Sequence, residues 1–69
     1  MLDPRLLAAF VEIVDTGSFT AAADRLHLTQ STVSQQLARL ESSVGQQLVD
    51  RNARPVQATV PGERLAGYA

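Results

Sequence analysis

Residues 19–41, FTAAADRLHLTQSTVSQQLARLE, contain the pattern from which the architecture follows. An alanine-rich segment over about residues 19–26 and a longer segment over about residues 30–44 are separated by the short break HLTQ. The alanines keep the first segment thin, so another helix can approach it closely. The apolar residues of the second segment recur at helical spacing and share one face: Val33, Leu37, Leu40 and Val44. The stretch predicts two packed helices joined by a tight turn.

The opposite face of the second helix is polar and nearly uncharged. It carries Ser31, Gln35, Ala38 and Ser42, flanked by Ser34 and Arg39. A solvated helix face usually mixes Glu and Lys, which form pairs four residues apart. An α-helix fits the DNA major groove, where Gln, Ser, Thr and Arg side chains reach base edges. This face therefore favours a helix-turn-helix that reads DNA, with an ordinary helical hairpin as the alternative.

The preceding segment, DPRLLAAFVEIVDTGS, predicts a further amphipathic helix. Asp3, Ser18 and Thr29 are suited to cap the three helices, and Gly17 and Gly45 are suited to end the first and third. We expect apolar contacts along the first helix and around the turn from Leu6, Leu7, Phe10, Val11, Ile13, Val14, Leu26 and Leu28.

The segment QQLVDRNARPVQAT changes period and predicts a wing of two short strands around the turn NARP. Arg51 would lie at the base of this wing and Arg54 at its tip. Arginines there suit phosphates or a narrow minor groove, where negative potential is enhanced. A plain surface hairpin is the alternative. After Thr59 helical character resumes, with Val60, Leu65 and Tyr68 as its apolar residues.

Composition limits the possible functions. The chain of 69 residues is one domain at most, and without cysteine it has no disulfide and no thiolate site. We see no membrane span and no signal peptide, which predicts a cytoplasmic protein. The net charge of −1 is unevenly spread: residues 1–24 hold four acidic residues against one arginine, and residues 25–54 hold four arginines against two acidic residues. This distribution permits nucleic-acid binding.

Catalysis and metal binding are not indicated. His27 is the single histidine, and no carboxylate pair, nucleophile–base set or glycine-rich phosphate loop is present. We therefore expect no enzyme. The remaining alternative is a winged-helix protein-interaction module without DNA binding. Steep salt dependence of duplex binding would favour DNA over that alternative.

Several motifs occur together in one order: GSFTAAADRL, TQSTVSQQLARLE, GQQL, and R…RP before T…G. Over about residues 2–66 the chain resembles the N-terminal DNA-binding domain of the LysR-type transcriptional regulators. The resemblance implies a mainly α winged helix-turn-helix fold, with three helices, a short two-stranded wing and the start of a linker helix. Residues 1–59 would form the DNA-binding domain, and residues 60–69 would begin a truncated dimerisation linker helix.

Position by position, the resemblance implies two sets of DNA contacts. Base or groove contacts would come from Gln30, Ser31, Ser34, Gln35 and Arg54. Phosphate contacts would come from Ser18, Thr29, Thr32, Arg39 and Arg51. The chain departs from the usual pattern where family members often have Arg (here Gln35), Pro (here Ser31) and Phe (here Val49). Gln35 and Ser31 imply a base preference that differs from that of better-known members, and Val49 implies thinner packing beneath the wing with its role unchanged.

The partners that the resemblance implies are double-stranded DNA with an interrupted inverted-repeat operator, and a second copy through the linker helix. The homodimer or higher homo-oligomer would act in the bacterial cytoplasm at the nucleoid, away from membranes. No cofactor is expected in this fragment. A small-molecule effector is expected for a missing C-terminal domain.

Overall fold

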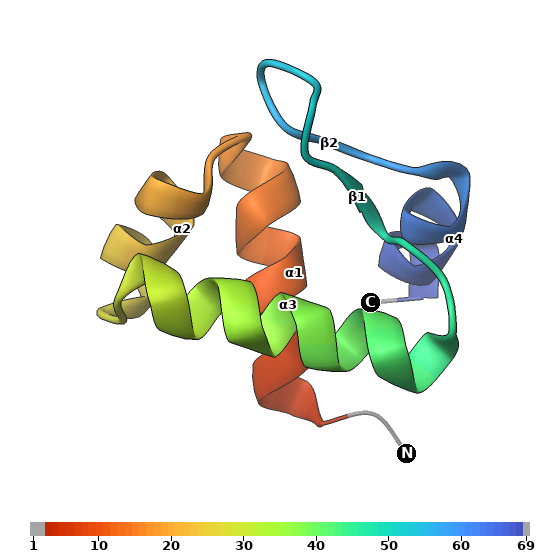
Figure 1. Ribbon diagram of the computed structural model, residues 1–69, viewed down its shortest axis with the longest axis horizontal. Coiled ribbons are helices and arrows are strands. Elements are labelled where there is room, and N and C mark those ends of the chain that lie inside the picture. Colours follow the sequence, from red (N-terminus) through yellow and green to blue (C-terminus); the bar gives the residue numbers. More distant parts are fainter. Residues whose placement is uncertain (1–2, 69) are drawn as a thin grey trace.

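The computed structural model describes residues 3–68, apart from the side chain of Tyr68. Its elements are α1 (Pro4–Thr16), α2 (Phe19–Leu26), α3 (Gln30–Val44), β1 (Val49–Asp50), β2 (Gln57–Ala58) and α4 (Val60–Tyr68). Figure 1 shows α3 crossing α1, with α2 at one side and α4 at the other. The mainly helical winged helix-turn-helix is confirmed. The predicted ranges include residues 1, 2 and 69, which lie outside the described residues. The apolar contact predicted for Tyr68 also lies outside them, because its side chain is not described.

The three predicted N-caps are confirmed. The side chains of Asp3, Ser18 and Thr29 each accept a backbone N–H from the first turn that follows, at 2.9, 3.2 and 3.1 Å. Such bonds satisfy donors that have no partner within the helix. Hydrogen bonds from Arg5 hold the pKa of Asp3 below its ordinary value, because they favour the ionised carboxylate.

Left-handed residues end the first three helices. Gly17 and Gly45 take φ values of 71° and 74°, as predicted, because glycine has no Cβ to clash there. The α2–α3 turn differs, since His27 takes φ 56° although it carries a side chain. The N–H of Leu28 then bonds to the carbonyl of Ala23 at 2.9 Å, which closes α2 and redirects the chain into α3.

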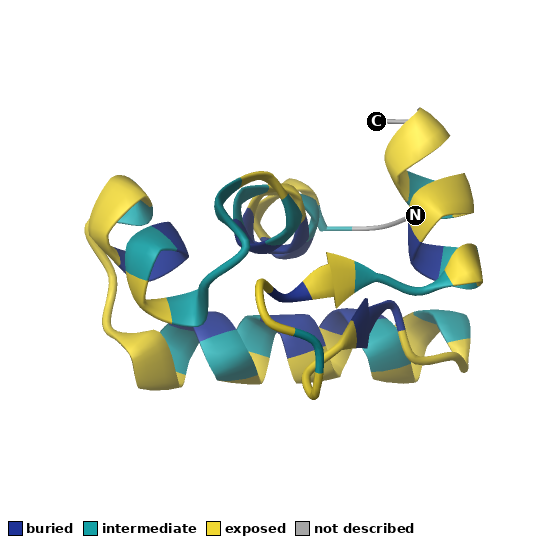
Figure 2. Cartoon of the chain, turned by 90° about the horizontal axis from the view of Figure 1, so that it is seen from above, coloured by how far each residue is buried: buried dark blue, intermediate teal, exposed yellow. Residues whose placement is uncertain are grey.

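The core lies between α1, α2, α3 and the strands. Figure 2 shows the inward side of α3 buried and its outer side exposed. Two expected contacts were wrong, because Val11 is 38% exposed and Leu28 is 39% exposed. The apolar stripe of α1 is wider than the surface that its neighbours cover, and Leu28 follows the left-handed turn, outside either helix. The buried hydrophobic residues are Leu6, Ala9, Phe10, Ile13, Ala22, Ala23, Val33, Leu37, Leu40, Leu48, Val49 and Val56.

The wing is an antiparallel pair in which Val49 lies opposite Ala58. Its returning arm is fastened to the junction between α1 and α2, where the Gly17 carbonyl accepts the N–H of Val56 at 2.9 Å. A Cβ on Gly17 would lie 2.7 Å from Cβ of Pro55, so the wing approaches this glycine closely. The wing is therefore held at a fixed place beside the helices.

The start of α4 packs on the entry to β1. The Thr59 hydroxyl accepts the N–H of Gly62 at 3.1 Å and donates to the Gln47 carbonyl at 2.7 Å. Gly62 is buried, and a Cβ there would overlap the Leu48 carbonyl oxygen. Only glycine allows this approach, which fixes the direction of α4.

Candidate nucleic-acid interface

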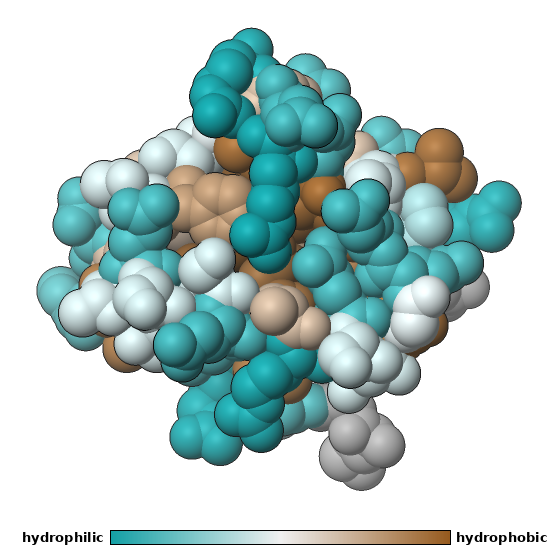
Figure 3. Space-filling model, viewed as in Figure 1, coloured by the Kyte–Doolittle hydropathy of each residue, from teal (hydrophilic) through white to brown (hydrophobic). Residues whose placement is uncertain are grey.

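A groove runs between the outer face of α3 and the wing. One part is lined by Gln30, Ser31, Ser34, Gln35, Ala38 and Arg51. The groove continues towards the α1–α2 junction, where it is lined by Gly17, Ser18, Phe19, Thr20, Gln30, Arg51, Arg54 and Val56. Figure 3 shows this face, which is mostly hydrophilic or neutral, with apolar atoms visible between the wing and α3. No carboxylate is among these lining residues.

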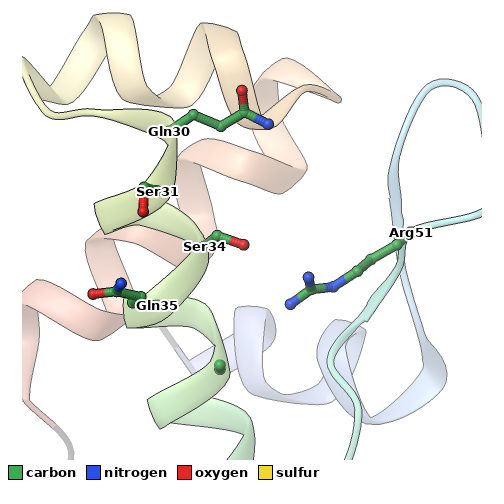
Figure 4. Close-up of a pocket in the computed structure, with 6 residues that line it drawn as sticks. Gln30, Ser31, Ser34, Gln35 and Arg51 are labelled. Carbon is green, nitrogen blue, oxygen red and sulfur yellow. The ribbon is translucent and has the colours of Figure 1, made fainter.

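The predicted reading residues of α3 come together along this groove. Ser31 and Gln35 are exposed, and Ser34 is half-buried. In Figure 4, Ser34 points towards the wing, whereas Gln35 points away from it along the outer side of the helix. Gln30 is exposed at the start of α3, where its Oε1 accepts the hydroxyl of Thr20 at 3.4 Å. The face offers hydroxyl and amide groups without a formal charge.

Arg54 occupies the turn of the wing, as predicted. It is exposed, and its Nη1 donates to the carbonyls of Arg51 at 2.6 Å and Ala53 at 3.0 Å. The guanidinium thus folds back over its own turn. A single guanidinium carries five N–H donors, so these two bonds leave most of its binding capacity.

Arg51 has partners inside the protein. Its Nη2 lies 3.8 Å from Oε1 of Glu41, and its guanidinium carbon lies 5.2 Å from the centroid of the Phe19 ring. The other carboxylate oxygen of Glu41 accepts the N–H of Leu48 at 2.8 Å. The one acidic residue of α3 is therefore turned towards the wing, with its side chain only 15% exposed.

Of the other residues expected to contact phosphates, only Ser18 lines the groove. Ser18 lines the groove, but its hydroxyl caps α2. Thr29 donates its hydroxyl proton to Thr32 at 2.9 Å, and neither residue lines the groove. Arg39 is exposed on α3 beyond the lining residues.

Sequence reasoning missed Phe19 and Thr20 as lining residues. Both lie at the start of α2, next to the cap that was predicted, and both reach the groove. The local pattern did indicate that α2 begins there. It gave no signal that Phe19 underlies an arginine of the wing, because that contact depends on the tertiary fold.

Acidic residues gather on other surfaces. Arg25 of α2 pairs with Asp15 at 3.2 Å and with Glu12 at 3.5 Å, both on α1. Asp15 also lines separate surface hollows, one of them with Glu63. The net charge of −1 is thus a poor description of the groove, where arginines are the only charged residues.

Among residues 3–68 no three His, Asp or Glu side chains gather as possible metal ligands. None of the helices in that range is long and apolar enough to cross a membrane.

Comparisons with known proteins agree with this geometry. Residues 4–63 match the model of the bacterial regulatory helix-turn-helix proteins of the lysR family. The transcriptional regulator LysG of Mycobacterium tuberculosis is 52% identical over 73 residues, covering 100% of this chain and 24% of that regulator. The chain thus spans about a quarter of that relative.

Solved structures show the same fold. The complex of the BenM DBD with benA site 1 DNA superposes with a TM-score of 0.92 at 40% identity, covering 97% of this chain and 75% of that one. ArgP from Mycobacterium tuberculosis gives a TM-score of 0.88 at 49% identity, covering 99% of this chain and 27% of that one.

Proposed function

The chain belongs to the lysR family of bacterial regulatory helix-turn-helix proteins, and on that basis we propose that it binds double-stranded DNA sequence-specifically, as the DNA-binding domain of a transcriptional regulator. In this proposal α3 lies in the major groove, and the wing contacts the minor groove or backbone. The observation that carries it is the carboxylate-free groove between the uncharged polar face of α3 and the arginines of the wing.

Base reading is assigned to Gln30, Ser31, Ser34 and Gln35. Glutamine can bond adenine at both N6 and N7, and serine can donate to or accept from several base edges. The exposure of Gln30, Ser31 and Gln35 on one side of α3 supports this role. The face has no arginine before residue 39, which disfavours the common arginine–guanine contact.

Backbone and minor-groove contacts are assigned to the edges of this surface. Arg54 enters the minor groove from the tip of the wing, where its exposure supports contact with the strands. Thr29 and Thr32 stand at the N-terminal turn of α3, whose free N–H groups favour phosphate. Ser18 and Arg39 contact phosphates on either side. Arg51 is considered separately below.

The whole regulator is a further part of the proposal. We propose a homodimer or higher homo-oligomer that pairs through α4 and binds an interrupted inverted-repeat operator in the bacterial cytoplasm. A small-molecule effector would bind a separate domain, and no catalytic step is assigned. A separate domain is supported by LysG, which is named a transcriptional regulator and is about four times as long as the part that this chain matches.

Titration of the chain against duplex DNA at several salt concentrations tests the proposal. A duplex selected from a randomised library is compared with a scrambled duplex of the same composition. We expect tighter binding to the selected duplex, and log K falling linearly with log salt, by about 0.9 per phosphate neutralised. Binding that is indifferent to salt and sequence would favour the protein-interaction module.

A further inference from the structure

We propose that Glu41 and Arg51 are positioning residues that hold the wing against α3, so that Arg54 enters the minor groove in register with the base contacts of α3. The inference rests on the proposed function, because it concerns the residues that position Arg54 for its proposed contact with the minor groove. It adds a residue, Glu41, that would touch no DNA and would still govern which flanking sequence is preferred.

The carboxylate of Glu41 binds both ends of β1. One oxygen accepts the N–H of Leu48, immediately before the strand, at 2.8 Å. The other lies 3.8 Å from the guanidinium of Arg51, immediately after the strand. Since Glu41 belongs to α3, the helix that reads bases and the first strand of the wing are joined through one side chain.

The guanidinium of Arg51 joins a third element. Its carbon lies 5.2 Å from the ring centroid of Phe19 at the start of α2, a separation typical of a cation–π contact. Arg51 also lines both parts of the groove. Figure 4 shows its side chain reaching from the wing towards α3. The base of the wing is therefore fixed by contacts with α2 and α3.

Positioning and direct phosphate contact predict different results. A phosphate-binding Arg51 would contribute to the salt slope on any duplex and would leave flank preference unchanged. A positioning Arg51 would affect flank preference, because Arg54 sits three residues further along the same turn. For Glu41 the two accounts differ in sign. If Glu41 acted only through its negative charge near DNA, its replacement would strengthen binding. If Glu41 positions the wing, its replacement weakens binding to the duplex with the preferred flank.

The first test is Glu41→Gln. The amide oxygen can still accept the N–H of Leu48, but the charge that pairs with Arg51 is gone. Two duplexes with the same selected half-site carry an A·T-rich or a G·C-rich flank. We expect the wild-type chain to prefer the A·T flank and the variant to lose about two- to fivefold of that preference, the range of a partly exposed ion pair. Its preference for the selected over a scrambled half-site should remain.

Glu63→Gln is the matched control, because it removes the same charge from an exposed position on α4. It should keep the flank preference of the wild-type chain. A Glu41→Gln chain that also keeps the full preference would overturn the inference.

Arg51→Met is the second test, and it keeps an apolar side chain over Phe19. The inference predicts a loss of flank preference at least as large as for Glu41→Gln, because the cation–π contact with Phe19 is lost as well. Adding Glu41→Gln to Arg51→Met should cause no further loss, and the salt slope on scrambled DNA should be unchanged. A slope smaller by about 0.9 with flank preference intact would instead show a phosphate contact and overturn the inference. If the wild-type chain itself shows no flank preference, the minor-groove role proposed for Arg54 is wrong, and the inference falls with it.

Discussion

Gln35 lies at the centre of the outer face of α3, exposed and directed away from the wing. If this face enters the major groove, the Gln35 amide bonds a base edge that is present only in the preferred sequence. Gln35→Ala should then weaken binding to the selected duplex by about 1–3 kcal/mol and leave binding to scrambled DNA nearly unchanged. Fluorescence anisotropy titrations on both duplexes measure the two losses.

Ser42→Ala provides a control for Gln35→Ala on the same helix, since Ser42 is exposed but does not line the groove. It should bind both duplexes as the wild-type chain does. Equal losses for Gln35→Ala on selected and scrambled DNA would mean that Gln35 does not read bases.

Arg54 is the corresponding residue of the wing. The two carbonyls that its guanidinium now contacts belong to its own turn, so the side chain can turn outward without disturbing the core. A narrow A·T-rich minor groove concentrates negative potential and attracts arginine. Arg54→Ala should therefore weaken binding more on an A·T-rich flank than on a G·C-rich flank, measured by the same titrations. Similar losses on both flanks would indicate contact with phosphate alone.

Among the elements, α4 depends on a glycine. Because a Cβ on Gly62 would overlap the Leu48 carbonyl, Gly62→Ala must push the first turn of α4 off the entry to β1. We expect it to lower the free energy of unfolding by about 1–3 kcal/mol, the usual cost of overpacking. Urea denaturation followed by circular dichroism measures this change.

Gly67→Ala is the control for Gly62→Ala within the same helix. A Cβ there would meet nothing within 4 Å. Alanine costs less backbone entropy than glycine in a helix, and Gly67 lies in the last turn of α4, so this variant should be no less stable than the wild-type chain. If both substitutions destabilised the chain equally, the cause would not be the clash with the Leu48 carbonyl, because Gly67 makes no such contact.

The ends of the elements could be predicted from the sequence because their causes are local. Asp3, Ser18 and Thr29 bond to N–H groups two or three residues away, and Gly17 and Gly45 need only their own backbone freedom. The buried stripe of α3 followed in the same way from helical spacing.

The contacts between distant segments could not be predicted in this way. The ion pair of Glu41 with Arg51, the ring of Phe19 under Arg51 and the fit of Gly62 on Leu48 arise only when the elements pack together. Periodicity shows which apolar residues share a face of a helix, but not how much of that face a neighbouring element covers. For this reason the burial expected for Val11 and Leu28 was wrong. The candidate surface was therefore visible in the sequence, and the contacts that orient its two halves were not.

For the molecule as a whole, self-association through α4 depends on how much apolar surface of that helix is exposed. Val60 is 63% exposed, whereas Leu65 already packs against the core of its own chain. At about 25 cal/mol per Å² of apolar area, so little surface yields only a few kcal/mol. Association costs at least as much. We therefore predict that these 69 residues are monomeric or weakly dimeric at micromolar concentration, as sedimentation equilibrium would show. A tight dimer would mean that they already contain the complete pairing surface.

The surface that meets DNA can be mapped on the isotope-labelled chain by NMR while the selected duplex is added. Polar and basic groups gather along α3 and the wing, and the acidic residues of α1 lie elsewhere. We predict that the largest amide shift changes fall on residues 29–39 and 51–56, and that residues around Val11, Val14 and Ala66 change little. Changes centred on the hollow between α1 and α4, with α3 and the wing unaffected, would contradict the assignment of this groove as the DNA-binding surface.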